Sequence, residues 1–220
     1  MIKAIIFDFD GVLAESFDIK TRAFARTFED EGEDAVKKVV AYHVANGGLS
    51  RFEKFRYIYR TILKRELTDE IFRDLCRRFE QFVVEEVVNA PSVRGADEFL
   101  KNTRGRYAMF ICSGTPQDEI RMIAEKRGIA QYFSSIYGSP AGKDEIVKRI
   151  IRENGLQPGD VLYIGDAMSD YEAAVANGLV FIGRTIPGND VLGGRCDMIA
   201  DLTGLDAVIA RVDMAKSGGR

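Results

Sequence analysis

The position of the first apolar strand constrains this sequence more than any other feature. The run KAIIFD at Lys3–Asp8 predicts a buried β-strand at the start of the chain. The next strand-like run is Tyr107–Cys112, about a hundred residues later. A strand this short and apolar is not stable alone, so it must pair with strands from the distant part of the chain. The residues between them are therefore an insertion into the fold.

The insertion has a helical pattern. From about Asp18 to Val88, apolar residues recur at spacings of three and four, which is typical of amphipathic helices. All five prolines of the chain lie at Pro91 or later, and a proline-free helical block indicates a separate bundle. We predict a helical cap over residues 15–91.

After Pro91 the pattern changes to alternating strands and helices, which predicts an α/β fold with a doubly wound parallel sheet. Residues 1–14 and 92–220 are expected to form this core. Expected strands after the cap are Tyr107–Cys112, Ser135–Tyr137, Val161–Ile164 and Leu179–Ile182. Expected helices are Pro116–Gly128, Asp144–Asn154 and Ser169–Asn177. A glycine marks the end of each one.

Composition excludes several classes of protein. Of the 220 residues, 46% are hydrophobic and 30% charged, which argues against a disordered chain, and no apolar run approaches the ~20 residues of a membrane span. The net charge of −3 argues against nucleic acid as the main partner. Three widely spaced cysteines and a single histidine, His43, argue against disulfides and a zinc site. Together with the absence of a signal-peptide pattern, they predict a cytoplasmic protein.

Polar residues gather where the predicted strands end. Asp8 and Asp10 follow the first strand, Ser113-Gly114 the second, and Lys143 comes after the third. Gly165-Asp166 follows the fourth, with Asp170 four residues later. In an open parallel sheet the carboxyl ends of the strands meet at one edge, where ligands bind. Any one of these residues alone is equally well explained as a helix cap or a loop charge, but four strand ends together indicate a site.

The carboxylates favour a metal. Asp8 and Asp10 would share a face of a straight strand, and like charges so close are costly unless a cation or proton lies between them. Oxygen ligands of this kind suit Mg²⁺. Asp166 and Asp170 would complete the ligand set, although they are also compatible with a turn followed by a helix cap.

These motifs resemble those of the haloacid dehalogenase superfamily of phosphohydrolases. FDFDGVL at Phe7–Leu13, ICSGT at Ile111–Thr115, Lys143 and GDAMSD at Gly165–Asp170 are similar to its four motifs, in order. The helical insert resembles the cap of the subgroup that holds phosphoglycolate phosphatase and β-phosphoglucomutase. The resemblance implies a Rossmann-like core and an Mg²⁺-dependent enzyme that acts on a small phosphorylated metabolite, as a monomer or homodimer.

The resemblance also implies roles, which simple chemistry supports. Asp8 would attack phosphorus and form an aspartyl phosphate, and Asp10 would serve as general acid and base. Mg²⁺ would be held by Asp8, Asp166, Asp170 and the backbone carbonyl of Asp10. Phosphoryl oxygens would be bound by the Ser113 hydroxyl, by Lys143, and by backbone N–H groups near them, for which the candidates are Gly11 and Gly114.

The cap carries the expected substrate contacts. In GLSR at Gly48–Arg51, Ser50 is placed to cap the next helix, and Arg51 resembles the arginine with which β-phosphoglucomutases hold a distal phosphate. Lys20 is a second candidate; it stands where those mutases carry histidine, and Thr115-Pro116 stands where they carry Ser-Lys. A phosphatase is therefore favoured, with a phosphomutase as the alternative.

Two other classes are less favoured. A signalling receiver domain also uses acidic residues, Mg²⁺ and lysine, but it is shorter and has no inserted bundle. A non-enzymatic phosphate-binding protein would be expected to lack Asp8, Asp10 or Lys143, and all three are present. The loop GSPAGKD at Gly138–Asp144 lacks the spacing of a nucleotide-binding P-loop.

Overall fold

The computed structural model describes residues 1–188 and 190–218; positions 189, 219 and 220 of the predicted core lie outside the described residues. Within these ranges the strands form one six-stranded sheet in the order β3-β2-β1-β4-β5-β6, and all neighbours are parallel. The strands are β1 Ala4–Phe7, β2 Ala108–Pro116, β3 Ser135–Ser139, β4 Val161–Gly165, β5 Val180–Arg184 and β6 Asp197–Ile199.

The first strand of the chain lies at the centre of the sheet. Ala4 pairs with Ala108 of β2 on one side and with Val161 of β4 on the other. All four residues of β1 are buried, which is why this segment is apolar on both faces. Its neighbours come from the distant part of the chain, as the sequence requires.

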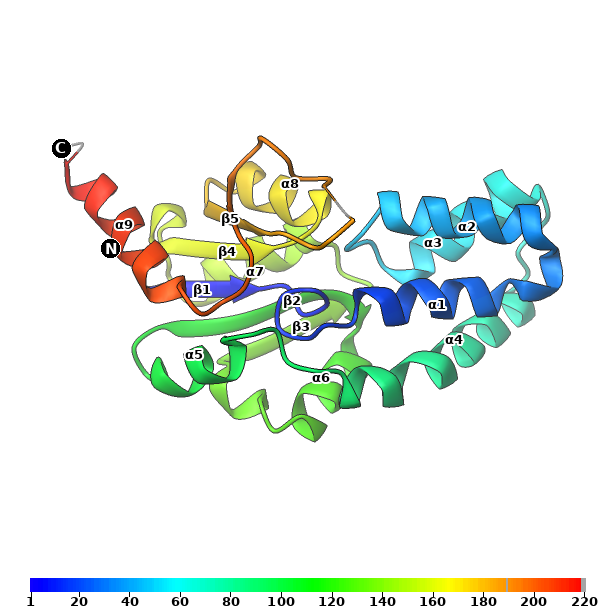
Figure 1. The fold of residues 1–220 in the computed structure, drawn as a ribbon, viewed down its shortest axis with the longest axis horizontal. Helices are drawn as coiled ribbons and strands as arrows, with labels where there is room; N and C mark the ends of the chain where they lie inside the picture. The colour runs from blue at the N-terminus through cyan, green and yellow to red at the C-terminus, as the bar shows by residue number, and fades with distance from the viewer. Residues whose placement is uncertain (189, 219–220) are drawn as a thin grey trace.

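Helices cover both faces of the sheet. Alternate residues of β1 belong to two separate apolar clusters: Ile5 and Phe7 pack with α5 Ala96–Asn102, α6 Gln117–Lys126 and α9 Leu205–Gly218, whereas Ala4 and Ile6 pack with α7 Lys143–Glu153 and α8 Met168–Ala176. Figure 1 shows α7 and α8 on one side of the sheet and α5 and α6 on the other. The predicted doubly wound α/β fold is confirmed.

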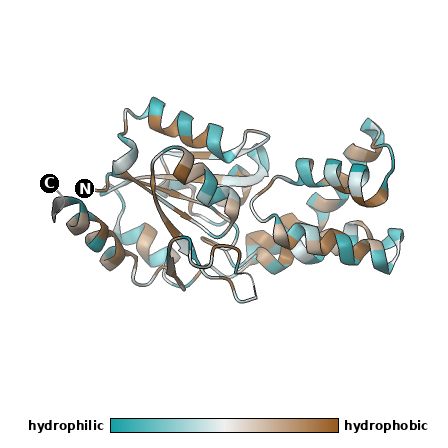
Figure 2. Cartoon of the chain, turned by 90° about the horizontal axis from the view of Figure 1, so that it is seen from above, coloured by the Kyte–Doolittle hydropathy of each residue, from teal (hydrophilic) through white to brown (hydrophobic). Residues whose placement is uncertain are grey.

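Between β1 and β2 the named elements up to residue 89 are all helical. They are α1 Phe17–Thr27, η1 Glu29–Glu31, α2 Glu33–Ala45, α3 Arg51–Tyr57, the π-helical turn η2 Ile58–Leu63, and α4 Asp69–Asn89. They lie at the end of the molecule away from the chain termini (Figures 1 and 2). Their shared interior is aromatic: the rings of Phe24, Phe55 and Phe79 contact one another. Within the described ranges, no helix is both long and apolar enough to cross a bilayer.

The two connections between the helical segment and the sheet run side by side. Ala14 forms an antiparallel bridge with Ser92, and the Glu15 N–H donates to the Pro91 carbonyl at 2.9 Å. Beside them, the Arg127 guanidinium donates to three carbonyl groups at the end of α4 and just after it, those of Val87, Val88 and Ala90. The division into a cap of residues 15–91 and a core stays a prediction, but the paired connections fall at its proposed boundaries.

Some elements differ from those expected. The strand predicted to end at Cys112 continues to Pro116, because Pro116 pairs with Ser139 of β3 after an irregular register that begins beyond Cys112. The sequence patterns did not predict α5, β6 and α9. The first two span only seven and three residues, which is too short for a periodic signal to show.

Candidate active site

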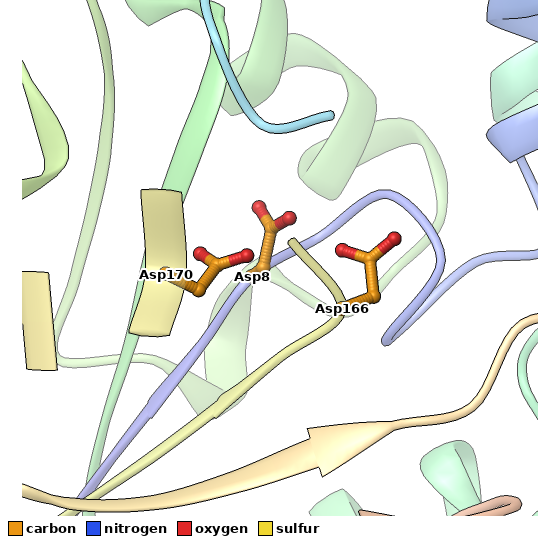
Figure 3. A group of neighbouring side chains, drawn as sticks. All are labelled: Asp8, Asp166 and Asp170. Atoms are coloured by element: carbon orange, nitrogen blue, oxygen red, sulfur yellow. The ribbon is translucent and has the colours of Figure 1, made fainter. Parts of the chain in front are cut away.

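Three carboxylates meet at the carboxyl edge of the sheet. Asp8 directly follows β1, Asp166 directly follows β4, and Asp170 lies in the first turn of α8. Each offers an oxygen that lies within 4.8 Å of those of the other two, and all three side chains are buried (Figure 3). The Asp8 carboxylate stands between the other two. The sheet thus brings together residues from distant parts of the sequence.

Lys143 is the buried cation of this cluster. It is the first residue of α7, and its Nζ lies 3.2 Å from Asp8 Oδ2 and 2.6 Å from Asp170 Oδ1. Burial alone would lower the pKa of Lys143, but the carboxylates of Asp170 and Asp8 outweigh it and raise the pKa. The lysine is therefore charged, and it links Asp8, the candidate nucleophile, to Asp170 of α8.

Asp170 is held by several donors at once. Its Oδ1 accepts from Lys143 and from the Tyr163 hydroxyl at 2.7 Å, and its Oδ2 accepts from the Ala167 N–H at 3.2 Å. Such a set of hydrogen bonds fixes the orientation of the carboxylate. Tyr163 lies on β4 within an apolar run, and nothing in the sequence distinguishes it from an ordinary core tyrosine.

The cluster carries more negative charge than Lys143 can balance. Burial raises the pKa of Asp8 to about 7, with Lys143 opposing and Asp170 and Asp10 adding to the rise. Burial, followed by the charges of Asp8 and Asp170, also raises the pKa of Asp166. Asp8 Oδ1 is buried with no hydrogen-bond partner among the described residues. An orphaned oxygen beside two further carboxylates fits a hard divalent cation such as Mg²⁺.

Asp10 faces a different set of groups. Its carboxylate accepts from the Ser16 hydroxyl at 2.7 Å and the Thr115 hydroxyl at 3.1 Å, and it forms an ion pair with Lys20 of α1. Burial alone would raise the pKa of Asp10, but Lys20, Ser16 and Thr115 outweigh it and lower the pKa. The Asp10 carboxylate is not in the three-carboxylate cluster, so a metal contact through its backbone carbonyl stays a prediction.

The predicted phosphate-binding groups lie around Lys143. Ser113, Gly114 and Lys143 border a cavity of about 310 Å³, and the Ser113 hydroxyl accepts from the Thr115 N–H at 3.1 Å. Gly11 packs against the metal candidates instead: it has a φ of +77°, and a Cβ there would lie 2.8 Å from Asp166 Oδ2. A glycine is required at this turn for both reasons.

The loop between α2 and α3 closes directly over these groups. A Cβ on Gly48 would lie 2.2 Å from Ser169 Oγ and 3.0 Å from Lys143 Nζ, and a Cβ on Gly114 would lie 2.5 Å from the Gly48 carbonyl oxygen. Ser50 caps α3, as predicted, and forms a capping box with Glu53. The sequence indicated this loop by its resemblance, but not how closely it approaches the lysine.

A second cavity, of about 50 Å³, separates the helical segment from the carboxylates. Asp8, Asp10 and Asp166 lie on its sheet side; the side chains on its helical side include Lys20, Arg51 and Lys54. The Arg51 guanidinium forms an ion pair with Glu119 of α6 and lies over the ring of Phe79. Substrate binding by Arg51 and Lys20 stays a prediction.

The structure brings Asp8, Asp166, Asp170 and Lys143 into one cluster and places Asp10 and Lys20 in another beside it. Sequence reasoning missed Glu119 and Lys54, which look like ordinary surface charges on amphipathic helices. It also missed the hydroxyl of Thr115, whose place in the SGT run gave a signal that could have been used.

Comparison with known proteins identifies the family of this chain. Residues 5–183 match the family described as haloacid dehalogenase-like hydrolase. The chain is 26% identical over 201 residues to the phosphoglycolate phosphatase of Synechococcus elongatus, covering 86% of each chain. It is 27% identical over 193 residues to the phosphoglycolate phosphatase of Pasteurella multocida, covering 83% of this chain and 85% of that one.

A solved structure shares the fold. The β-phosphoglucomutase of Clostridium difficile superimposes with a TM-score of 0.80 and 17% identity, covering 99% of this chain and 100% of that one. At this identity the likeness concerns the fold alone. The family resemblance inferred from the four motifs is confirmed: the chain belongs to the haloacid dehalogenase-like hydrolases.

Proposed function

We propose that this protein is an Mg²⁺-dependent phosphatase that hydrolyses a small phosphate monoester through an aspartyl phosphate on Asp8. The environment of the Asp8 carboxylate carries the proposal. One of its oxygens is paired with Lys143 at 3.2 Å, and the other is buried without a partner beside Asp166 and Asp170. A carboxylate that is held rigidly but incompletely satisfied is available both to a cation and to phosphorus.

The first step would form a bond between Asp8 and phosphorus while the ester P–O bond breaks. Lys143 and the Ser113 hydroxyl would hold the phosphoryl oxygens, and the departing oxygen would take its proton from Asp10. When bound to Asp8, Asp166 and Asp170, Mg²⁺ would neutralise the charge that develops on the phosphoryl group. In the second step water would attack phosphorus and Asp10 would accept its proton, while the bond between phosphorus and the Asp8 oxygen breaks, which releases phosphate and restores the Asp8 carboxylate.

The Lys20–Asp10 ion pair bears on these proton transfers. The lowered pKa of Asp10 keeps it ionised, which is the state that accepts a proton from water. Donating a proton to the departing oxygen requires the protonated form. Lys20 would therefore have to leave Asp10 when substrate binds.

The relatives make phosphoglycolate the first substrate to test, since both are named phosphoglycolate phosphatases. The narrow cavity above Asp8 also favours a short molecule. A mutase reaction needs a second firm phosphate grip, and Arg51, its expected source, is already paired with Glu119. This observation favours the phosphatase over the phosphomutase.

The test is phosphate release from 2-phosphoglycolate and p-nitrophenyl phosphate with Mg²⁺. Asp8→Asn should abolish turnover and leave the far-UV circular dichroism unchanged, because the amide is isosteric but a poor nucleophile. Asp118→Asn, an exposed aspartate in α6, is the matched control and should retain full activity. Acid quenching during turnover should trap a phosphorylated wild-type protein. A folded Asp8→Asn variant with wild-type rates would refute the nucleophile assignment, and steady release by the wild type would exclude a receiver or a mere binding protein.

A further inference from the structure

Three cations of the helical segment reach the narrow cavity that lies above Asp8. Lys20 is neutralised by Asp10, and Arg51 is neutralised by Glu119. Lys54, the third, is 2% exposed and forms no ion pair with any carboxylate of residues 1–188 and 190–218. The cavity therefore holds one buried lysine whose charge, when it is protonated, no carboxylate of the described residues pairs with.

Leaving this charge unbalanced has a cost. Burial lowers the pKa of Lys54 to about 7, and the charges of Lys20 and Lys143 lower it further, against smaller opposing effects of Asp10 and Asp166. A buried ammonium group without a counter-ion is unfavourable, and an anion that enters the cavity would remove that penalty. The position of Lys54 therefore favours binding of an anionic ligand over stability of the ligand-free protein.

His43 supplies a second polar group at the same place. The Lys54 ammonium donates to His43 Nδ1 at 2.9 Å, and burial, with help from Lys54 and Lys20, lowers the pKa of His43 to about 2. The ring is therefore neutral, and with Nδ1 accepting, its proton lies on Nε2. Nε2 is buried with no partner among the described residues, and the ring is stacked on Phe24. An unpaired N–H donor thus accompanies the unpaired cation.

Both residues line the cavity whose other side is formed by Asp8, Asp10 and Asp166. A substrate whose phosphoryl group lies at Asp8 would direct its non-reacting end toward α2 and α3, where His43 and Lys54 lie. These groups form an anion receptor: an ammonium group without a counter-ion and an N–H donor, beside the rings of Phe17, Phe24 and Phe79.

We propose that Lys54, positioned by His43, binds a second anionic group at the non-reacting end of the substrate. Resting on the proposed phosphatase function, this assigns the substrate to short phosphate monoesters that carry a carboxylate or a second phosphate. Lys54, more than the paired Arg51, then determines which monoesters are accepted. An uncharged end would leave the ammonium group buried and unpaired, so neutral analogues would be rejected.

The experiment compares substrates that differ only in that end. The kcat/KM for 2-phosphoglycolate is divided by that for 2-hydroxyethyl phosphate, in which a hydroxymethyl group replaces the carboxylate. The wild-type ratio should be large, and Lys54→Met should reduce it roughly ten- to a hundredfold, the worth of one charge-assisted contact. Lys54→Arg should retain part of the ratio. Lys38→Met, the same change at an exposed position of α2, is the matched control and should leave the ratio as in the wild type.

A binding measurement makes the result independent of turnover. Calorimetric titration of 2-phosphoglycolate into Asp8→Asn, with and without Lys54→Met, should show a dissociation constant at least tenfold weaker without the lysine. An ethylene glycol bisphosphate arm distinguishes a second phosphate from a carboxylate. Equal losses on charged and neutral substrates, or unchanged affinity, would overturn the role of Lys54. Absence of phosphate release from every ester by the wild type would instead refute the proposed function.

Discussion

Arg51 and Glu119 form an ion pair across the boundary between α3 and α6, with side chains that are 5% and 6% exposed. The guanidinium also lies 4.7 Å from the ring centroid of Phe79 in α4. Burial raises the pKa of Glu119, an effect that Arg51 opposes, so Glu119 depends on Arg51 to remain charged. The pair fastens the helical segment to the sheet domain at the rim of the site.

Removing one partner of this ion pair should lower the free energy of unfolding far more than replacing both partners. Arg51→Ala leaves the Glu119 carboxylate buried without a partner, and we expect a loss of roughly 3–5 kcal/mol in the free energy of unfolding. Arg51→Met combined with Glu119→Leu should lose much less, because no buried charge remains. Urea denaturation of Arg51→Met, of Glu119→Leu and of the variant that combines them measures the coupling. Losses that simply add would mean that the two side chains act independently.

Gly48 should be essential for closure over Lys143. Its φ is +77°, and a Cβ would lie 2.2 Å from Ser169 Oγ. Gly48→Ala should therefore hold the loop away from the site and reduce kcat/KM by on the order of ten- to a hundredfold. Gly32→Ala is the matched control, since Gly32 has a φ of +86° but nothing within 4 Å of the added atom. If both variants lose activity equally, backbone strain is responsible and not the contact.

Removal of divalent metal should abolish activity. Chelation with EDTA leaves Asp8, Asp166 and Asp170 without the cation their charges favour, and Mg²⁺ should restore turnover. Ca²⁺ should inhibit, because its larger coordination sphere tolerates geometries that hold Asp8 away from phosphorus. Mg²⁺ should also raise the Tm of the wild type but not that of Asp166→Asn. Full activity in chelator would contradict a metal site.

Lys54 should make stability depend on pH in a defined window. Its pKa is lowered from 10.5 to about 7 on folding, so between these values the unfolded chain binds the proton and the folded chain does not. The free energy of unfolding should consequently rise as pH increases from 7 to 9, by up to about 3 kcal/mol relative to Lys54→Met. Denaturation of both proteins at pH 7, 8 and 9 tests this. Parallel profiles would show that burial does not suppress the charge of Lys54.

The sequence predicted those features that depend on local patterns of residues, such as buried strands and the residues at their ends. Burial on both faces makes β1 apolar, and the carboxyl ends of parallel strands converge, so Asp8, Asp166 and Lys143 were predictable as neighbours. The partner of Arg51 was not predictable, because Glu119 follows 68 residues later and occupies a first helical turn, where acidic residues are common for other reasons. Lys54 has the helical spacing of a surface lysine. Only the structure shows that it is buried, beside His43 of α2 and the ring of Phe24 of α1.

The paired connections at Glu15 and Pro91 have a mechanical consequence. A body tied at two points that are hydrogen-bonded to each other has one easy rotation, about the axis through those points, and resists twisting about the others. A single swing would therefore seat Gly48 over Lys143 and Arg51 on Glu119 in one movement. Exclusion of water, pairing of charges and selection of substrate would then occur together. A molecule that obstructs one of these contacts would prevent the others from forming.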